Sequence, residues 1–355
     1  MKKLVYILGF LTLTSSTVTS IEILNKNINY QNINNNPKSF NISENNEVEQ
    51  KTTIYIDQNG NRKSTTDLDL TDLNTEEIIK IGNHNGKAIL FPKNVKKVPR
   101  DLPKGITDLT SSFRSLKSNK VEGIQHWDTS NITNMSHMFN STVNFNQDIG
   151  DWNTSNVTNM AEMFNSSFSF NNNISKWDTS NVTNMASMFS NAKVFNQSLN
   201  NWNTSNVTDM SQMFFAASNF NQKIDDWDTS NVINMSSMFS RAETFNQSLD
   251  SWNTSNVTNM YGMFFGAINF NGLIANWNTS NVTNMGSMFL NTPNFNKDIS
   301  NWNTSNVIDM SQIFMSSTTF NQDLSIWNVS KVKYYLMFDL GADNWEDKNK
   351  PNFTL

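Results

Sequence analysis

Tryptophan recurs at an unbroken 25-residue interval through much of this 355-residue chain. The nine residues that keep this interval are Trp127, Trp152, Trp177, Trp202, Trp227, Trp252, Trp277, Trp302 and Trp327. A fixed period of about 20–50 residues is the signature of stacked structural repeats. The interval therefore predicts a solenoid in which each unit forms one rung, with every tryptophan ring buried between rungs as part of the repeat core.

Other positions are nearly as constant when each unit is numbered from its tryptophan as position 0. Position +5 is always Val or Ile, +8 is Met in eight units, and +12 and +18 are Phe in eight units. Positions +8, +11, +12 and +15 have the i, i+3, i+4, i+7 spacing of one helix face, and a β-branched residue at +5 suits a short strand. We therefore predict a leucine-rich-repeat-like solenoid, with one short parallel strand plus a short helical segment in each rung.

The rest of the chain divides by composition and pattern. Residues 1–20 are predicted to be a signal peptide, because two lysines precede an apolar run, with an uncleaved membrane anchor as the alternative. Residues 21–50 are Asn-rich and predicted to be a disordered linker. Alternating patterns and Asn-Gly turn signals predict a small β-rich module over 51–100. A degenerate capping repeat (101–126), the nine-unit solenoid (127–345) and a C-terminal tail (346–355) follow, and the stretch from Val332 to Phe338 reads as one residue shorter than its counterparts.

The composition excludes several classes of function. There is no cysteine, so disulfides, thiol catalysis and a lipid-modified cysteine are ruled out. The net charge is −5 and Lys and Arg do not cluster, which argues against nucleic acid as a partner. With the signal segment, these features predict a secreted or cell-surface protein whose membrane contact would come only from an uncleaved signal.

The repeats also carry a family resemblance. Units such as the one from Trp252 to Met260 (WNTSNVTNM), which closes on Phe270-Asn271, resemble those of the BspA-like leucine-rich-repeat surface proteins, most closely the mycoplasma lipoprotein-associated branch. The lead-in from Val95 to Pro103 is similar to that branch as well. The resemblance covers about residues 90–340 and implies an exported adhesin or host-interaction factor. Many relatives carry a lipobox cysteine, which this chain lacks, so membrane anchoring does not follow from the resemblance.

Three sets of repeated polar residues have a functional and a structural interpretation. Asn at +19 and Ser at +3 could form a binding ladder, but side chains that satisfy turn backbone groups explain them better. Asp128, Asp178 and Asp228 at +1 could hold calcium, but the converging carboxylates that calcium needs are missing. Thr at +2 and +6 could line a flat ice- or glycan-binding face, although Thr is equally expected on half-buried strands.

Catalytic chemistry has little support in the sequence. The three histidines, His84, His126 and His137, have neither metal-ligand spacing nor a triad arrangement. No phosphate-binding glycine loop and no distinctive carboxylate pair is present. We therefore predict a protein that is not an enzyme and uses no cofactor and no metal.

Position +13 is the most informative variable position. It changes from Asn140, Asn165 and Ser190 in early units to a set of apolar residues that Ser240 interrupts: Phe215, Phe265, Leu290 and Met315. Because units stack in register, these four residues would form a column that binds a partner. The alternative is that +13 extends the core beside the Phe at +12.

The function that these observations favour is non-catalytic binding outside the cell, through the solenoid surface, to a protein or glycan of a host or neighbouring cell. The alternative is a structural, self-associating coat protein without a specific host ligand. A β-solenoid glycan hydrolase would need a carboxylate cluster on adjacent rungs, which the sequence does not show.

Overall fold

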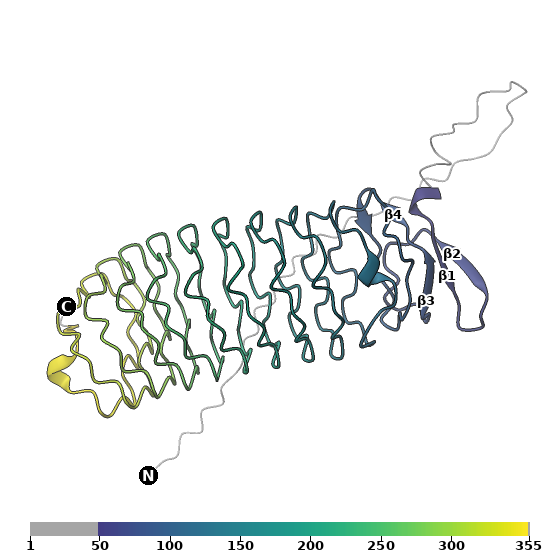
Figure 1. Ribbon diagram of the computed structural model, residues 1–355. Helices are drawn as coiled ribbons and strands as arrows, with labels where there is room; N and C mark the ends of the chain where they lie inside the picture. Colours follow the sequence, from purple (N-terminus) through teal and green to yellow (C-terminus); the bar gives the residue numbers. More distant parts are fainter. Residues whose placement is uncertain (1–48, 354–355) are drawn as a thin grey trace, which may run out of the picture. The chain divides into compact units, whose positions relative to one another are not determined.

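The computed structural model describes residues 49–353, so the predicted signal peptide and nearly all of the predicted linker lie outside the described residues. The N-terminal part forms two small antiparallel sheets. Strands β1 (Thr53–Ile56), β2 (Arg62–Thr65) and β3 (Glu77–Lys80) form one sheet in the order β2-β1-β3. Strands β4 (Asn83–His84) and β5 (Lys87–Ala88) form the other, joined through Asn85 and Gly86, which both have positive φ as a tight hairpin turn requires (Figure 1).

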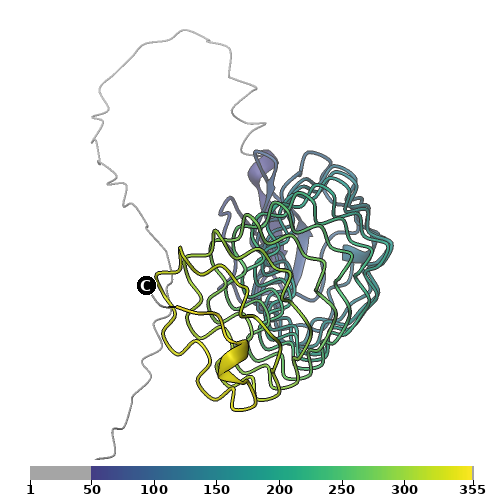
Figure 2. The same ribbon diagram turned by 90° about the vertical axis from the view of Figure 1, so that its left-hand side faces the viewer.

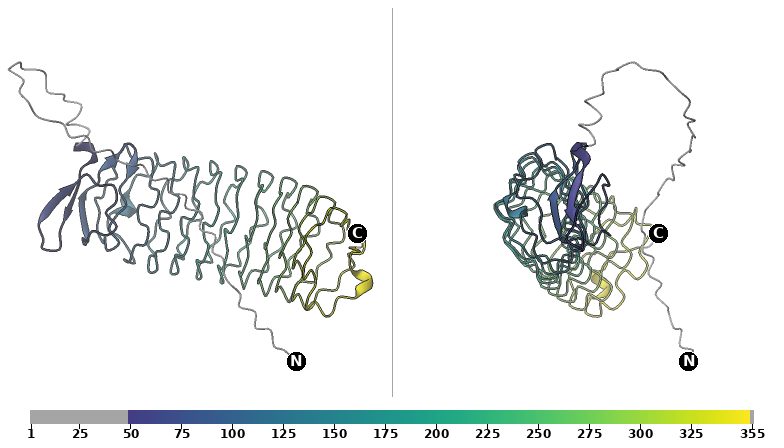
Figure 3. Two further views of the ribbon diagram at one scale, coloured as in Figure 1. Left: turned by 180° about the vertical axis from the view of Figure 1, so that it is seen from behind. Right: turned by 90° about the vertical axis from the view of Figure 1, so that its right-hand side faces the viewer.

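The repeats stack in register along one axis, as the row of loops in Figure 1 and the reverse view in Figure 3 show. Neighbouring rungs join through a single-residue parallel β-bridge at +7, which links Asn134 to Asn159 and continues to Tyr334. Bridges from Glu77 of β3 to Lys97, and from Lys97 to Glu122, join the N-terminal sheet to the first rungs. The short 3-10 helix η1 (Ile124–His126) leads into the first tryptophan, and η2 (Asp347–Asn349) lies in the C-terminal tail.

The predicted strand-plus-helix rung is wrong. Within residues 127–345, all of which are described, the chain has turns and isolated bridges but neither an α-helix nor an extended parallel strand. Positions +10 and +14 have positive φ in every rung, from 56° at His137 and 61° at Ser141 to 55° at Met337 and 80° at Gly341. An α-helix of L-residues cannot contain such positions.

The hydrogen bonds of one rung show what replaces the helix. The N–H groups of Met135, His137, Phe139 and Ser141 donate to carbonyls of the next rung, at 2.7–3.0 Å. Between them, the N–H groups of Met138 and Asn140 close i to i+3 turns within the rung, as from Met138 to the carbonyl of Met135 at 3.2 Å. These turns return the chain to the core at +8, +11, +12 and +15, which produces the same apolar spacing as a helix face without helical backbone.

The core consists mainly of aromatic columns. In the eight rungs before the last, the Phe at +12 stacks on the Phe at +18, with centroids 3.8 Å apart for Phe164 and Phe170 and 4.2 Å for Phe314 and Phe320. Successive +12 rings stack between rungs, as at 5.7 Å between Phe214 and Phe239. The end view in Figure 2 looks along these superimposed rungs. Burying rings in offset stacks gives a long, continuous core to units that could not fold singly.

The last rung keeps the repeat register, so the prediction that it is one residue shorter is wrong. Phe314 donates to the carbonyl of Phe338, and Ser316 to that of Leu340, as their equivalents do in earlier rungs. Phe338 therefore takes position +11. Trp345 takes position +18 and packs edge-on against Phe314 and Phe320, at 5.0 Å each.

Candidate binding surface

The structure places the four apolar residues at +13 on the outside of the turn that follows the buried +12 ring. Phe215, Phe265, Leu290 and Met315 are all half-buried, whereas Phe214 and Phe264 beside the first two are fully buried. The neighbouring position +14 has positive φ, and its N–H bonds to the +13 carbonyl of the next rung, as from Arg241 to Phe265 at 2.6 Å. Backbone bonds thus hold the column in register.

Three of the four polar residues at +13 in the first five rungs are buried, whereas Asn165 is half-buried like the apolar residues. Ser190 and Ser240 are only 3% and 1% exposed, and Asn140 is 8% exposed. A small side chain at this position sinks below the surface, whereas Phe, Leu or Met rises out of it. The column is therefore neither core nor fully exposed, because each large side chain keeps one side available to a partner.

Exposed apolar residues at +16 lie three positions along the chain from this column. Val143 is 51% exposed, and Phe168 and Ile268 are 38% exposed. Two cationic side chains lie over aromatic rings at these positions. Lys193 lies 5.5 Å from the ring of Phe168, and Arg241 lies 5.4 Å from the ring of Phe265. These contacts combine flat apolar surface with positive charge, a combination common in protein binding sites. The +16 positions do not stand out in the sequence, because their residue types vary from rung to rung.

The repeated Asn residues have structural partners. The side-chain oxygen of Asn146 at +19 accepts the backbone N–H of Asn171 in the next rung, at 2.9 Å. The amide of Asn156 at +4 donates to the carbonyl of Ser130 in the preceding rung, at 2.7 Å. Asn134 at +7 accepts the N–H of Ser136, at 3.0 Å. The same contacts recur along the array, so these Asn side chains stabilise turns and rung boundaries.

The aspartates at +1 take the same position as asparagine in other rungs. The carboxylate of Asp178 accepts the backbone N–H of Ser180 at 2.9 Å, as Asn153 does with Ser155 at 3.0 Å. The hydroxyl and the N–H of Ser180 lower the pKa of Asp178, and those of Ser230 do the same for Asp228. Within the described part of the chain, no group of three His, Asp or Glu residues could hold a metal ion.

Only one of the two threonine columns faces solvent. Thr at +2 is buried, and its hydroxyl donates to a carbonyl of the next rung, as from Thr204 to Asp228 at 2.9 Å. Thr at +6 is exposed, and Thr208 also contacts a backbone carbonyl, that of Thr183, at 3.2 Å. Thr at +2 therefore cannot contribute to a flat binding face.

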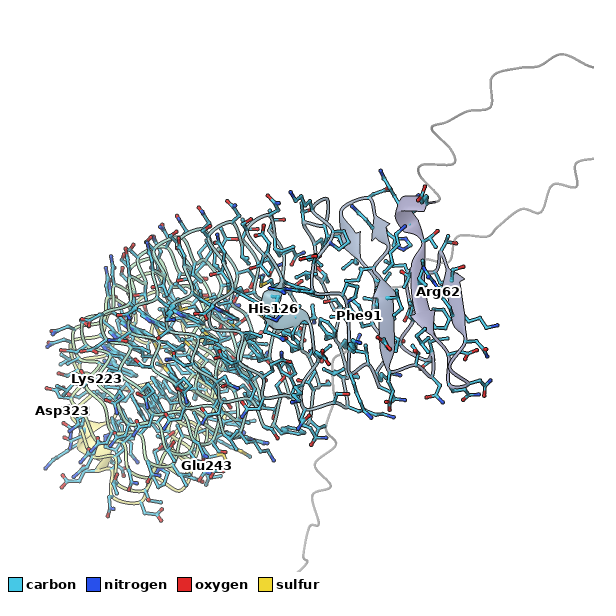
Figure 4. The ribbon with its side chains drawn as sticks, turned by 45° about the vertical axis from the view of Figure 1, so that its right-hand side comes forward. Arg62, Phe91, His126, Lys223, Glu243 and Asp323 are labelled. Atoms are coloured by element: carbon cyan, nitrogen blue, oxygen red, sulfur yellow. The ribbon has the colours of Figure 1, made fainter. Side chains whose placement is uncertain are left out.

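The three histidines lie apart in the fold. His84 is on β4, where burial lowers its pKa and its Nε2 atom has no partner among the described residues. His126, which is labelled in Figure 4, is the last residue of η1 and is exposed. His137 lies 3.2 Å from the carboxylate of Glu162, which also accepts a hydrogen bond from Asn140. The structure therefore brings none of them together.

All nine tryptophans of the interval are 2–5% exposed. Each indole N–H donates to a backbone carbonyl 28 residues earlier, from Trp127 to Pro99 at 3.0 Å through to Trp327 to Ile299 at 3.2 Å. From Trp227 onward the indole rings also stack on one another, at 5.8–6.4 Å. The rings therefore belong to the core, and they are not available to a partner.

Comparison with protein families gives a match over most of the array. The family described as "Mycoplasma protein of unknown function, DUF285" matches residues 107–210, 195–285 and 265–350, which together make up more than half of the chain. The chain belongs to this family. No curated protein and no solved structure matches the chain. Among the described residues, no helix is long and apolar enough to cross a membrane.

Proposed function

We propose that this member of the family is a non-catalytic binding protein outside the cell, an adhesin that contacts a protein or glycan on a host or neighbouring cell. The observation that carries the proposal is the half-buried column of Phe215, Phe265, Leu290 and Met315. The polar ladders are committed to backbone contacts, so specificity falls to positions that vary between rungs. A rigid array that holds large apolar side chains in register can contact a macromolecule at several points at once.

Two further features support the proposal. The repeat consensus resembles that of BspA-like surface proteins, although the rungs lack the strand and helix of a leucine-rich repeat. The predicted signal peptide would take the chain out of the cytoplasm. Because the chain has no cysteine, an oxidising environment outside the cytoplasm could not form disulfides in it.

The test compares the binding of purified protein to host cells before and after Phe215→Ser and Phe265→Ser are introduced together. The control variant is Leu273→Ser, because Leu273 is 50% exposed and lies at +21, outside the column. We expect saturable binding that the double variant weakens by at least about tenfold, with little change in the melting temperature, since serine already occupies +13 in two rungs.

Two outcomes would overturn the proposal. Loss of thermal stability with binding intact would place the column in the core. Concentration-dependent self-assembly without saturable binding to cells would favour the structural coat.

A further inference from the structure

The C-terminal rung ends the array with unpaired backbone donors. In the step before it, Met310, Gln312, Phe314 and Ser316 donate their N–H groups to carbonyls of the last rung, at 2.8–2.9 Å. The equivalent N–H groups of the last rung belong to Tyr335, Met337, Asp339 and Gly341, and they donate to no atom within residues 49–353. The tail crosses a different part of this end, where the N–H of Leu324 donates to the carbonyl of Asn349.

This edge presents backbone N–H donors, whereas the carbonyls beside them already accept hydrogen bonds. The carbonyls of Tyr334, Leu336, Phe338 and Leu340 accept from the preceding rung. Those of Tyr335, Met337 and Asp339 accept N–H groups within the last rung, in i to i+3 turns. An ordinary β-edge presents both N–H and C=O groups and can pair with any strand. The turns of the rung, with positive φ at +10 and +14, give this edge a single polarity instead.

The side chains around the donors are unusually apolar and exposed. Leu336 at +9 is 73% exposed, Leu340 at +13 is 53% exposed, and Met337 at +10 is 45% exposed. In the eight earlier units, position +10 is His, Glu, Ser, Gln or Gly. An apolar residue at +10 is therefore found only in the last described rung.

An aromatic cavity adjoins the first donor. Tyr335 and Phe353 line a cavity of about 270 Å³ together with Val332, Asn328 and Ser330. Phe353 stacks on Tyr335 with centroids 4.6 Å apart. The edge therefore combines a row of N–H donors with an aromatic hollow at one end.

The excess of hydrogen-bond donors on this edge determines which kind of chain could bind to it. A second copy that met it with the same edge would oppose donors to donors. The other end of the array carries β2, the outer strand of the order β2-β1-β3, whose free edge presents N–H groups as well as carbonyls (Figure 1). An ordinary strand would bring N–H groups of its own, and burying these without acceptors is unfavourable.

We propose that this edge binds an extended proline-rich segment of another protein. Proline has a backbone carbonyl and no N–H, so a run of prolines supplies acceptors only. Such a run is extended without internal hydrogen bonds, and aromatic-lined grooves recognise it. The site shares no residue with the column of Phe215, Phe265, Leu290 and Met315, although Leu340 occupies +13 in the last rung, and it does not depend on the adhesin proposal.

The test uses the full chain and two fluorescent peptides, a proline decamer and a Gly-Ser decamer of equal length, with binding followed by anisotropy. We expect saturable binding of the proline decamer, and binding at least about tenfold weaker for the Gly-Ser decamer and for the double variant Leu336→Ser/Met337→Ser, which leaves position +13 unchanged. The control Ile326→Ser should bind like the unmodified protein, because Ile326 is 74% exposed at +24, outside the edge.

A second measurement reads the donors directly. Binding of the proline decamer should slow amide hydrogen exchange at Tyr335, Met337, Asp339 and Gly341. Equal binding of the two peptides, self-association through this end, or no added protection at these amides would each overturn the proposal. None of these outcomes bears on the +13 column, so the two proposals fail separately.

Discussion

The indole nitrogen of Trp227 donates a hydrogen bond to the carbonyl oxygen of Leu199 across a rung boundary, at 3.0 Å. The ring is 3% exposed. Trp227→Ala should destabilise the array by about 3–5 kcal/mol, because it removes a large buried side chain and leaves a cavity. Trp227→Phe should cost less but still about 1–3 kcal/mol, because the carbonyl of Leu199 loses its donor. Urea unfolding, with hydrogen exchange to locate the effect, measures both.

The control for Trp227 is Ile326→Ala, which truncates an exposed apolar side chain of another rung. It should leave stability within about 0.5 kcal/mol of the unmodified protein. A cost near zero for Trp227→Ala would contradict a core role for the ring.

Two threonines of one rung should respond differently to substitution by valine. Thr204 is buried and donates its hydroxyl to the carbonyl of Asp228, so Thr204→Val should cost about 1–3 kcal/mol. Thr208 is exposed, and the carbonyl of Thr183 that it contacts already accepts the backbone N–H of Thr208. Thr208→Val should therefore be nearly neutral. Thermal unfolding of the two variants side by side makes the comparison, and equal costs would contradict this assignment.

Period and burial could be predicted from the sequence because each depends on residue identity. Trp at 0, Phe at +12 and Phe at +18 recur without exception or nearly so, and large apolar residues at fixed positions in a repeat must share a core. The polar Asn at +19 could likewise be assigned to backbone contacts. These predictions needed no knowledge of the path of the chain between core positions.

The backbone of the rung could not be predicted in the same way. The spacing of Met135, Met138 and Phe139 fits a helix face and fits two consecutive turns equally well. The signal that separates them lies at +10 and +14, where Gly262 and Gly266 have positive φ in one rung and residues such as Ser187 and Asn191 do so elsewhere. Serine and alanine are weak indicators of a left-handed conformation, so the pattern at these positions did not stand out.

The left-handed positions make their own prediction. Ser187 has a φ of 55°, so Ser187→Val should cost about 1–2 kcal/mol, because a β-branched side chain is strained there. Ser187→Asn should be tolerated, since asparagine adopts this conformation more readily. Ser169→Val serves as the control, because Ser169 is not among the residues with positive φ. Chemical denaturation measures all three, and equal losses for both valine variants would contradict a backbone origin.

Glu162 should make the stability of the early rungs depend on pH. The hydrogen bond from His137 and the nearby positive charges of His137 and Arg114 lower the pKa of Glu162, while burial opposes them. Because the folded pKa lies below the unfolded value, the carboxylate stabilises the fold above its ordinary pKa, and this contribution is lost as the pH falls through the folded pKa. Glu162 is partly exposed, so the contribution should stay below about 1 kcal/mol.

The variant Glu162→Gln removes this titration while it keeps the size of the side chain. Its difference in unfolding free energy from the unmodified protein should therefore be largest near neutral pH and should shrink as the pH falls from about 5 towards 3. Glu243→Gln, at an exposed position of a later rung, provides the control and should show a smaller difference at every pH. A difference for Glu162→Gln that grew on acidification would mean that the carboxylate destabilises the fold, contrary to the geometry around His137.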